Sequence, residues 1–391
     1  MKNARFPFQS GLWLILGLVA SALAIVGLMF NGTTVFLRAY LFSYLFWLGL
    51  TLGCLAIAMI SYLTQSSWGY ISRWILEAGA RTIWLMLILF IPIVLGVMQL
   101  YVWAVPANVQ GDPLLAHKSP YLNVPFFLIR AAIYFAVWII FTQMLSRMAG
   151  KFDTYLNPEK QRTFRTLSAI GLIAYFLTMS FAAIDWIMSL TPDWFSTIFG
   201  MLVITGQALS AFSFVLLMLP SLAKWEPLHS AITTRNFQDL GALLLTSVMT
   251  WAYLAFSQLL IIWSGNIPSE VRWYYDRSAG GWLLVGTLVA AFQFALPFLL
   301  LISTRVRQSP AWLASLGLLI LVMRLVDSFW MVMPTFSPRQ FSFHWLDIVL
   351  PLAIGGLWMA VFAWFIRRAN VFVPEKVSTS TGAETKTSSA S

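Results

Sequence analysis

Charged residues are scarce in this chain. Only 10% of its 391 residues are Asp, Glu, Lys or Arg, whereas 60% are hydrophobic. The mean hydropathy is +0.80. So few charges cannot cover the surface of a soluble globule, which excludes the soluble protein classes. The composition therefore predicts an integral membrane protein, and its long apolar runs predict an all-α one.

Metal-binding and redox side chains are equally rare. The single cysteine, Cys54, excludes an internal disulfide and a cysteine-ligated metal or iron–sulfur cluster within the chain. The three histidines, His117, His229 and His344, fall in loops or at segment ends, so they offer no ligand pair for a haem inside the membrane. Phosphate-binding loops, HExxH pairs and nucleophile elbows are also missing. We therefore expect no cofactor or metal in this chain.

Apolar runs of about 20 residues predict ten transmembrane helices. They cover residues 11–30, 37–60, 82–102, 124–148, 166–190, 196–220, 239–264, 281–302, 311–334 and 345–366. Lys2 and Arg5 precede the first run as in a signal peptide, but the run is longer than a usual signal core, so we expect it to stay. Residues 1–368 then form one transmembrane domain. Residues 369–391, rich in Ser and Thr, predict a disordered cytoplasmic tail.

The basic residues predict the orientation in the membrane. The net charge is +10, and most of the 24 Lys and Arg residues fall in segments on the side of the two termini. The opposite segments hold only Arg38, Lys118, Arg272, Arg277 and Arg339. By the positive-inside rule both termini are cytoplasmic. The positive charge therefore indicates membrane orientation and not nucleic-acid binding.

Short strings recur at a shift of four spans. Asp185 in span 5 and Asp327 in span 9 each precede a proline, Pro192 and Pro334, by seven residues. The string LSAIGL in span 5 matches LASLGL in span 9. An even shift keeps the direction across the membrane, as in parallel repeats. We predict two four-helix bundles, spans 2–5 (about 37–190) and spans 6–9 (about 196–334), flanked by spans 1 and 10.

Several charges lie inside the predicted spans, toward the outer side. Asp185 is about five residues, roughly 7 to 8 Å, below the outer end of span 5. Arg324 and Asp327 have the i,i+3 spacing that lets them pair on one helix face. The other candidates for this outer group are Arg130, His344 and Asp347. A charge in hydrocarbon is costly, so each is a candidate functional residue.

Two interpretations of these charges stay open. In the first, Arg324 with Asp327 and Arg130 with Asp185 are ion pairs that only hold helices together. In the second, they line a hydrated half-channel or a quinone pocket, and the two acids exchange protons. Asp185 has no counter-ion three or four residues away in its own helix, so it is the first candidate for a functional acid.

Candidates are fewer toward the inner side. Glu77 and Asp239 each open a predicted span, where the helix dipole favours an acid even without a function. Tyr134 and Tyr175 lie within spans and are candidate members of a water chain, although each is explained equally well by a hydrogen bond between helices. These four residues complete the predicted proton path.

Four segments resemble a known family. They are DWIMSLTPDWFSTIFG from Asp185, the segment 239–282 that begins DLGALLLTSVMTWAYL, VDSFWMVMPTFSP from Val326, and HWLDIVLPLAIGGLW from His344. They are similar to the F subunits of bacterial alternative complex III, in the NrfD-like, polysulfide-reductase membrane subunit family. The resemblance covers most of spans 5–10.

The resemblance implies a quinol to cytochrome c (or other periplasmic acceptor) oxidoreductase of the bacterial inner membrane, in a respiratory or photosynthetic chain. It implies menaquinone as a substrate, with haem c and iron–sulfur clusters on partner subunits, and a homologous quinol-binding membrane subunit as neighbour. Asp185, Arg324, Asp327, His344 and Asp347 fall in or beside the matching segments. Three functions remain: a redox-silent subunit that moves protons, a direct quinol-binding subunit, and a structural anchor for redox subunits.

Overall fold

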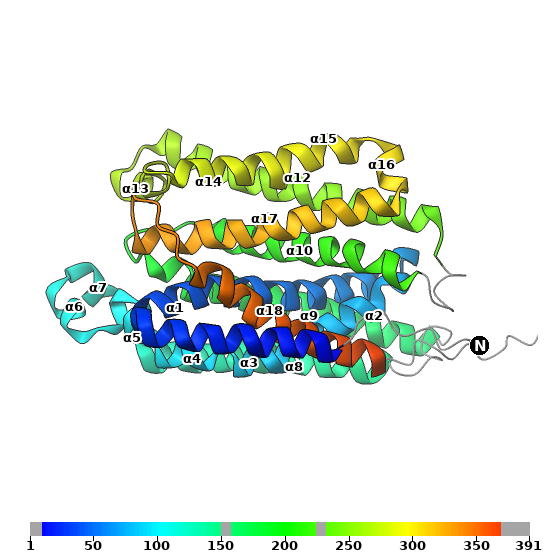
Figure 1. Ribbon diagram of the computed structural model, residues 1–391, viewed down its shortest axis with the longest axis horizontal. Helices are drawn as coiled ribbons and strands as arrows, with labels where there is room; N and C mark the ends of the chain where they lie inside the picture. The colour runs from blue at the N-terminus through cyan, green and yellow to red at the C-terminus, as the bar shows by residue number, and fades with distance from the viewer. Residues whose placement is uncertain (1–9, 150–157, 224–231, 369–391) are drawn as a thin grey trace, which may run out of the picture.

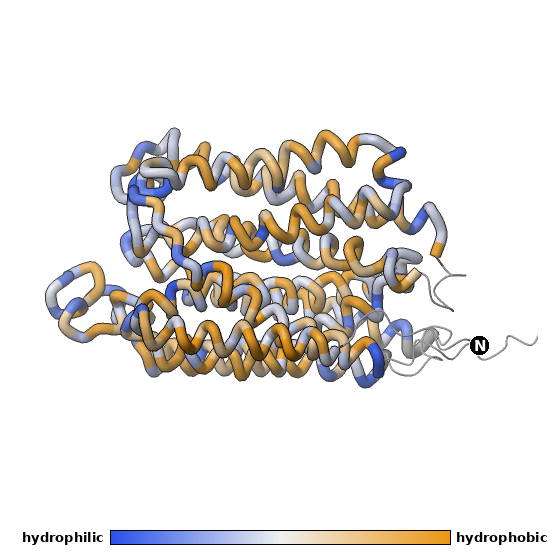
Figure 2. The backbone as a smooth tube through the Cα atoms, viewed as in Figure 1, coloured by the Kyte–Doolittle hydropathy of each residue, from blue (hydrophilic) through white to orange (hydrophobic). Residues whose placement is uncertain are grey.

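The computed structural model describes residues 10–149, 158–223 and 232–368, and these ranges contain helices and no strand. Nine helical stretches within them are long and apolar enough to cross a membrane. The helices lie side by side along the long axis, with hydrophobic residues along their middles and hydrophilic ones mostly at the two ends (Figures 1 and 2). The prediction of an all-α membrane protein is confirmed. The predicted tail, 369–391, lies outside the described residues.

The first half of the chain contains α1 (Ser10–Thr64), α2 (Ser67–Arg81), α3 (Ile83–Ile88), α4 (Ile91–Leu95), α5 (Val97–Leu100), η1 (Val102–Ala104), α6 (Pro106–Gly111), α7 (Pro113–Lys118), α8 (Val124–Ala149), α9 (Pro158–Trp186) and η3 (Met188–Leu190). The second half contains α10 (Phe199–Leu222), α12 (Thr234–Gly265), α13 (Pro268–Arg277), α14 (Trp282–Val289), the π-helical η4 (Ala290–Ala295), α15 (Leu296–Ile302), α16 (Thr304–Gln308), α17 (Pro310–Phe336) and α18 (Leu346–Arg368).

Helix α1 reverses direction at Gly32, whose φ of 80° and ψ of 164° are not helical. Both halves pack on α18. Gly17, before the reversal, lies against Gly356, and Thr51, after it, accepts a hydrogen bond from the Trp358 indole at 2.8 Å. Residues 34 positions apart in α1 thus contact the same turn of α18. The two predicted runs 11–30 and 37–60 are therefore two antiparallel helices.

The third predicted span, 82–102, is placed too late. Its helix begins at Ser67 with α2 and continues through α3 and α4 to α5, with breaks at residues 82, 89–90 and 96. Arg73, Glu77 and Arg81 lower the hydropathy of α2, so a search for apolar runs passes over it although its other face is buried. Pro92 stands in the first turn of α4, where the chain restarts after the break at 89–90.

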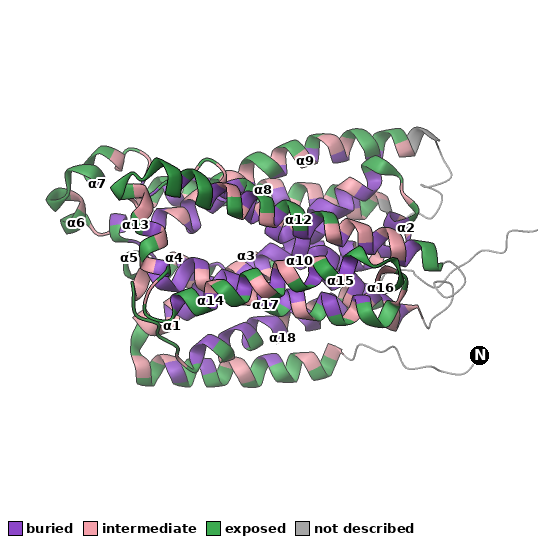
Figure 3. Ribbon diagram, turned by 90° about the horizontal axis from the view of Figure 1, so that it is seen from above, coloured by how far each residue is buried: buried purple, intermediate pink, exposed green. Residues whose placement is uncertain are grey.

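Helix α10 lies at the centre of the molecule and packs against α1, α9, α12 and α17 (Figure 3). Small residues allow these close contacts. A Cβ atom built on Gly53 of α1 would lie 2.1 Å from the carbonyl oxygen of Gln207, and one on Gly317 of α17 would lie 2.5 Å from that of Ser213. Small residues at helix contacts are typical of membrane proteins, because packing there replaces the hydrophobic effect as the force that joins helices.

The two ends of the bundle differ. Helices α6, α7 and α13 project at one end, the left in Figure 1. At the other end α1 begins and α18 finishes, where Arg367 donates a hydrogen bond to Ser10 at 3.3 Å. The loops that the sequence predicts on opposite sides of the membrane thus lie at opposite ends of the bundle.

The reversal at Gly32 predicts a specific sensitivity. Changing Gly32 to Ala should lower the stability of the protein by about 1 to 3 kcal/mol, because this φ,ψ region is essentially restricted to glycine. Gly11 in the same helix is the matched control, since a Cβ on either glycine meets nothing within 4 Å and only Gly32 has a positive φ. Thermal unfolding in detergent measures both. Equal melting temperatures for Gly32→Ala and Gly11→Ala would contradict the argument.

Candidate functional site

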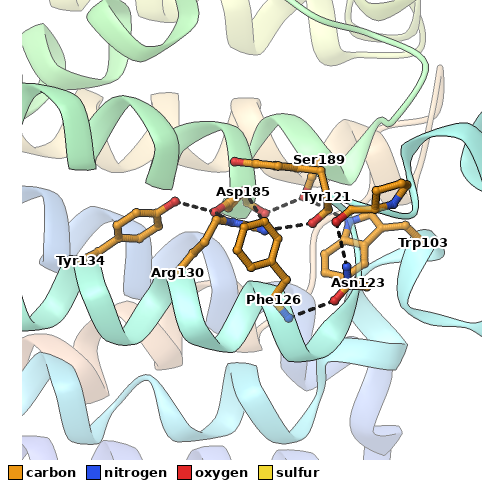
Figure 4. Close-up of polar contacts among 9 residues, drawn as sticks. Trp103, Tyr121, Asn123, Phe126, Arg130, Tyr134, Asp185 and Ser189 are labelled. Atoms are coloured by element: carbon orange, nitrogen blue, oxygen red, sulfur yellow. Dashed lines mark hydrogen bonds and ion pairs between the residues drawn. The ribbon is translucent and has the colours of Figure 1, made fainter.

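Asp185 lies in the last turn of α9 and is fully buried. Its two carboxylate oxygens accept hydrogen bonds from Nε and Nη2 of Arg130 in α8, at 2.7 and 3.0 Å, and Oδ2 also accepts one from the Tyr134 hydroxyl at 2.8 Å (Figure 4). The end of a helix carries partial negative charge, so an acid there is unfavourable unless a cation compensates it. Arg130 supplies that compensation.

Arg130 is itself held from several sides. Its Nη1 donates to the backbone carbonyl of Tyr121 at 2.9 Å. Its guanidinium lies over the Tyr121 ring at 3.9 Å and over the Phe126 ring at 4.4 Å. Both stacking contacts are of cation–π type, which is strongest when water is excluded. The arginine that the sequence analysis considered as one partner for Asp185 is therefore its counter-ion, and it comes from another helix.

The end of α9 is fixed by two further hydrogen bonds. The Ser189 hydroxyl donates to the Asp185 carbonyl at 2.5 Å and accepts from the Trp103 indole at 3.1 Å. Beside them lies a pocket of about 230 Å³, lined by Tyr121, Ser189 and residues of α7. Burial, followed by the negative charge of Asp185, raises the pKa of Tyr121 to about 12. Tyr121 therefore stays a neutral phenol at physiological pH.

The second buried pair lies within α17, where Arg324 and Asp327 form the predicted i,i+3 ion pair. Both side chains are buried. The guanidinium of Arg324 packs directly on α10, where a Cβ atom built on Gly206 would lie 2.3 Å from its Nη2. Unlike Arg130, this arginine has an Nε with no hydrogen-bond partner among the described residues. Asp327 accepts a hydrogen bond from Nη1 of Arg324, whereas Asp185 accepts three hydrogen bonds from two residues.

Tyr175 reaches the surroundings of Arg324 through a residue that the sequence analysis did not select. The Tyr175 hydroxyl donates to Oε1 of Gln207 in α10 at 2.6 Å. Gln207 and Arg324 line the same enclosed cavity of about 30 Å³, together with Ser210 and Ser328. That volume is sufficient for one or two water molecules with polar partners. The sequence signal that could have identified Gln207 is that it is the lone glutamine in the apolar run 196–220.

His344 and Asp347 lie at the start of α18 and contact each other there. The Asp347 carboxylate accepts from the backbone N–H of His344 at 2.8 Å, so it caps the start of α18. The His344 ring contacts the Asn31 side chain at 3.2 Å, next to the reversal in α1. Helix capping and the positive charge of a helix start explain the contact of Asp347 with His344. The structure thus gives these two residues a local partner apart from both buried pairs.

The inner acids lie elsewhere than the sequence analysis placed them. Glu77 does not open a helix, since α2 begins at Ser67, ten residues earlier. It accepts a hydrogen bond from the Tyr62 hydroxyl of α1. Asp239 is the sixth residue of α12, whose start is capped instead by Thr233 and Asn236. The helix-dipole explanation for both acids is therefore wrong, because neither stands in a first turn.

A pocket of about 370 Å³ adjoins Tyr62 at the inner end of α1 and α2. Its lining is comparatively polar and includes Gln65, Ser66 and Gln161. Through Tyr62 this pocket reaches Glu77. The arrangement is a polar recess joined through Tyr62 to a half-buried carboxylate.

No protein-family model matches this chain, and no curated protein matches it.

The Arg130–Asp185 pair predicts a large and non-additive effect on stability. Changing Asp185 to Asn should cost about 3 to 5 kcal/mol, because it leaves a buried guanidinium without its anion. Adding Arg130→Met should recover part of that loss. Asp193→Asn is the control, since Asp193 is one-third exposed and pairs with Arg272 at 3.5 Å, so its loss should cost less than about 1 kcal/mol. Additive losses from chemical unfolding in detergent would contradict the pairing.

Proposed function

We propose that this chain is a membrane subunit of a quinol to cytochrome c (or other periplasmic acceptor) oxidoreductase of the NrfD-like type, without a redox centre of its own, and that it helps to move protons across the membrane. The resemblance of four long segments supports the family. The observation that carries the role is the small enclosed cavity that joins Arg324 of the buried ion pair to Gln207 and Tyr175.

The proposed topology has ten crossings. The reversal at Gly32 supplies two of them from α1. One four-helix bundle comprises the second half of α1, α2–α5, α8 and α9, and the other comprises α10, α12, α14–α15 and α17. The contacts of α8 with α9, of α10 with α12 and α17, and of α14 with α17 support this division. The excess of basic residues at the end where α1 begins supports cytoplasmic termini.

The proposed proton path has an outer and an inner part. In the outer part Asp327 exchanges the proton, with Arg324, the enclosed cavity, Gln207 and Tyr175 leading inward. In the inner part the recess beside Tyr62 admits a proton to Glu77. Water molecules held by side chains with hydroxyl or amide groups would carry the proton between these acids. Acids inside the membrane commonly mark proton routes.

Asp327 replaces Asp185 as the first candidate acid in this proposal. Asp185 accepts two hydrogen bonds from Arg130 and a third from Tyr134. Protonating its carboxylate would leave the buried Arg130 without an anion, which costs a large free energy. Asp327 borders a second and larger cavity, lined by α12 to α17. We therefore assign the Arg130–Tyr134–Asp185 group to joining α8 with α9, and Asp239, His344 and Asp347 to positions beside the path.

Two alternatives stay in view. Direct binding of menaquinol at the outer end is favoured by the pocket of about 230 Å³ next to the Arg130–Asp185 pair. A purely structural anchor is favoured by the complete pairing of Asp185. In each case the proposed setting is the inner membrane of a bacterium. The proposed partners are a homologous quinol-binding membrane subunit, an iron–sulfur subunit that carries the iron–sulfur clusters, and c-type cytochrome subunits that carry haem c.

The proton yield of the complex in liposomes tests the proposal. Replacing Asp327 with Asn should leave quinol oxidation measurable while fewer protons are translocated per electron, because the path loses its exchangeable acid. Asp276→Asn is the matched control, since Asp276 lies in α13 and pairs only with the exposed Arg272 and Arg339 among the described residues. An unchanged proton yield in Asp327→Asn would contradict the proton path. If Asp327→Asn lowers the amount of assembled complex but the complex that does assemble keeps a normal proton yield, the structural anchor is favoured.

A further inference from the structure

A cavity of about 750 Å³ lies in the second half of the chain, between α10, α12, α13, α14–α15 and α17. Its lining is almost entirely apolar and aromatic. Tyr253 and Phe256 of α12 line it and are 70% and 63% exposed, so the cavity opens on the surface that faces lipid in a membrane. A molecule that enters from that side must therefore be soluble in the bilayer.

One end of this cavity carries a buried cation. Arg277, the last residue of α13, is 3% exposed and lines the cavity. Its nearest acid in sequence, Asp276, pairs instead with Arg272 and Arg339. Among the described residues Arg277 has no carboxylate within ion-pair distance. Burial lowers the pKa of Arg277 to about 9, which leaves the guanidinium charged at neutral pH.

The hydrogen bonds of Arg277 are incomplete. Its Nη1 donates to the Trp273 carbonyl at 3.1 Å, and its Nη2 donates to the Met331 carbonyl at 2.8 Å and to the Thr335 hydroxyl at 3.2 Å. Its Nε has no partner among the described residues, and neither does the indole Nε1 of Trp330, which lines the same cavity. Two buried N–H donors at one end of an apolar cavity require acceptor oxygens.

The rest of the cavity suits a hydrocarbon chain. Along α12 its lining extends from Leu259 to Met249, ten residues or about 15 Å, which is half the thickness of the hydrocarbon core. Phe294 and Phe298 line its deeper part. Helix α13, at the polar end, lies at the end of the bundle with α6 and α7 (Figure 1). The polar end therefore lies at the depth of lipid headgroups.

We propose that this cavity is a binding site for one phospholipid, whose phosphate and ester oxygens accept hydrogen bonds from Arg277 and Trp330 while an acyl chain fills the space between α12 and α14–α15. The phosphate supplies the anion that the buried guanidinium lacks. A neutral ring with carbonyl oxygens would satisfy the donors and leave the charge uncompensated, which favours the phospholipid. Asp327, the exchanging acid of the proposed proton path, lines the same cavity, so the phospholipid would lie beside that path.

Lipid occupancy measured by native mass spectrometry tests this site. The full-length protein, in its complex, is stripped with detergent and then titrated with phosphatidylglycerol. We expect one phospholipid to bind more tightly than the rest, and Arg277→Gln to weaken it about tenfold or more, because charge-assisted hydrogen bonds to phosphate are lost. Arg339→Gln is the matched control, since Arg339 is an exposed arginine at the same end and should leave the tight site unchanged.

A second variant separates loss of the lipid site from misfolding of Arg277→Gln. Ala290 lines the cavity and is exposed there, so Ala290→Trp fills the space without removing a hydrogen bond and should also abolish the tight site. A tight phospholipid that survives both variants would overturn the proposal. Displacement of that lipid by an equimolar long-chain quinone, with tighter binding of the quinone, would overturn it as well and would assign the cavity to a neutral ring.

Discussion

A charge buried inside the membrane is costly unless another group compensates it, and the two buried ion pairs of the described structure follow that constraint. Asp185 is the clearest case, because its carboxylate is fully buried and sits at the unfavourable end of a helix. Arg130 and Tyr134, both from α8, satisfy it. This group therefore joins two helices, and the stacking of Arg130 on Tyr121 joins the loop that precedes α8 to the same point.

The second pair obeys the same constraint with a different geometry. Arg324 and Asp327 compensate each other within α17, so neither needs a charged partner from another helix. The neighbouring helix supplies only space and polar groups, through Gly206 and Gln207 of α10. A pair that is complete within one helix can change its protonation without releasing a contact between helices. This difference is the physical reason for assigning exchange to Asp327 and cohesion to Asp185.

Much of the architecture could be predicted from the sequence, because hydropathy and the length of apolar runs reflect the bilayer directly. The i,i+3 pair of Arg324 and Asp327 was predictable for the same local reason. The start of α2 was not, since its buried face is interrupted by Arg73, Glu77 and Arg81 and so falls below the hydropathy of a span. The pairing of Asp185 with Arg130 was only one of two open interpretations, because 55 residues separate them and no local rule selects one distant helix.

The infrared difference spectrum of the proposed complex, recorded as quinol is oxidised, tests the central assignment most directly. A carboxylic acid that gains or loses a proton produces a carbonyl stretching band that shifts in deuterated water. We expect such a band from the complex, its loss in Asp327→Asn and its persistence in Asp185→Asn. A band that survives in Asp327→Asn and disappears in Asp185→Asn would contradict the account, because it would assign proton exchange to Asp185 and not to Asp327.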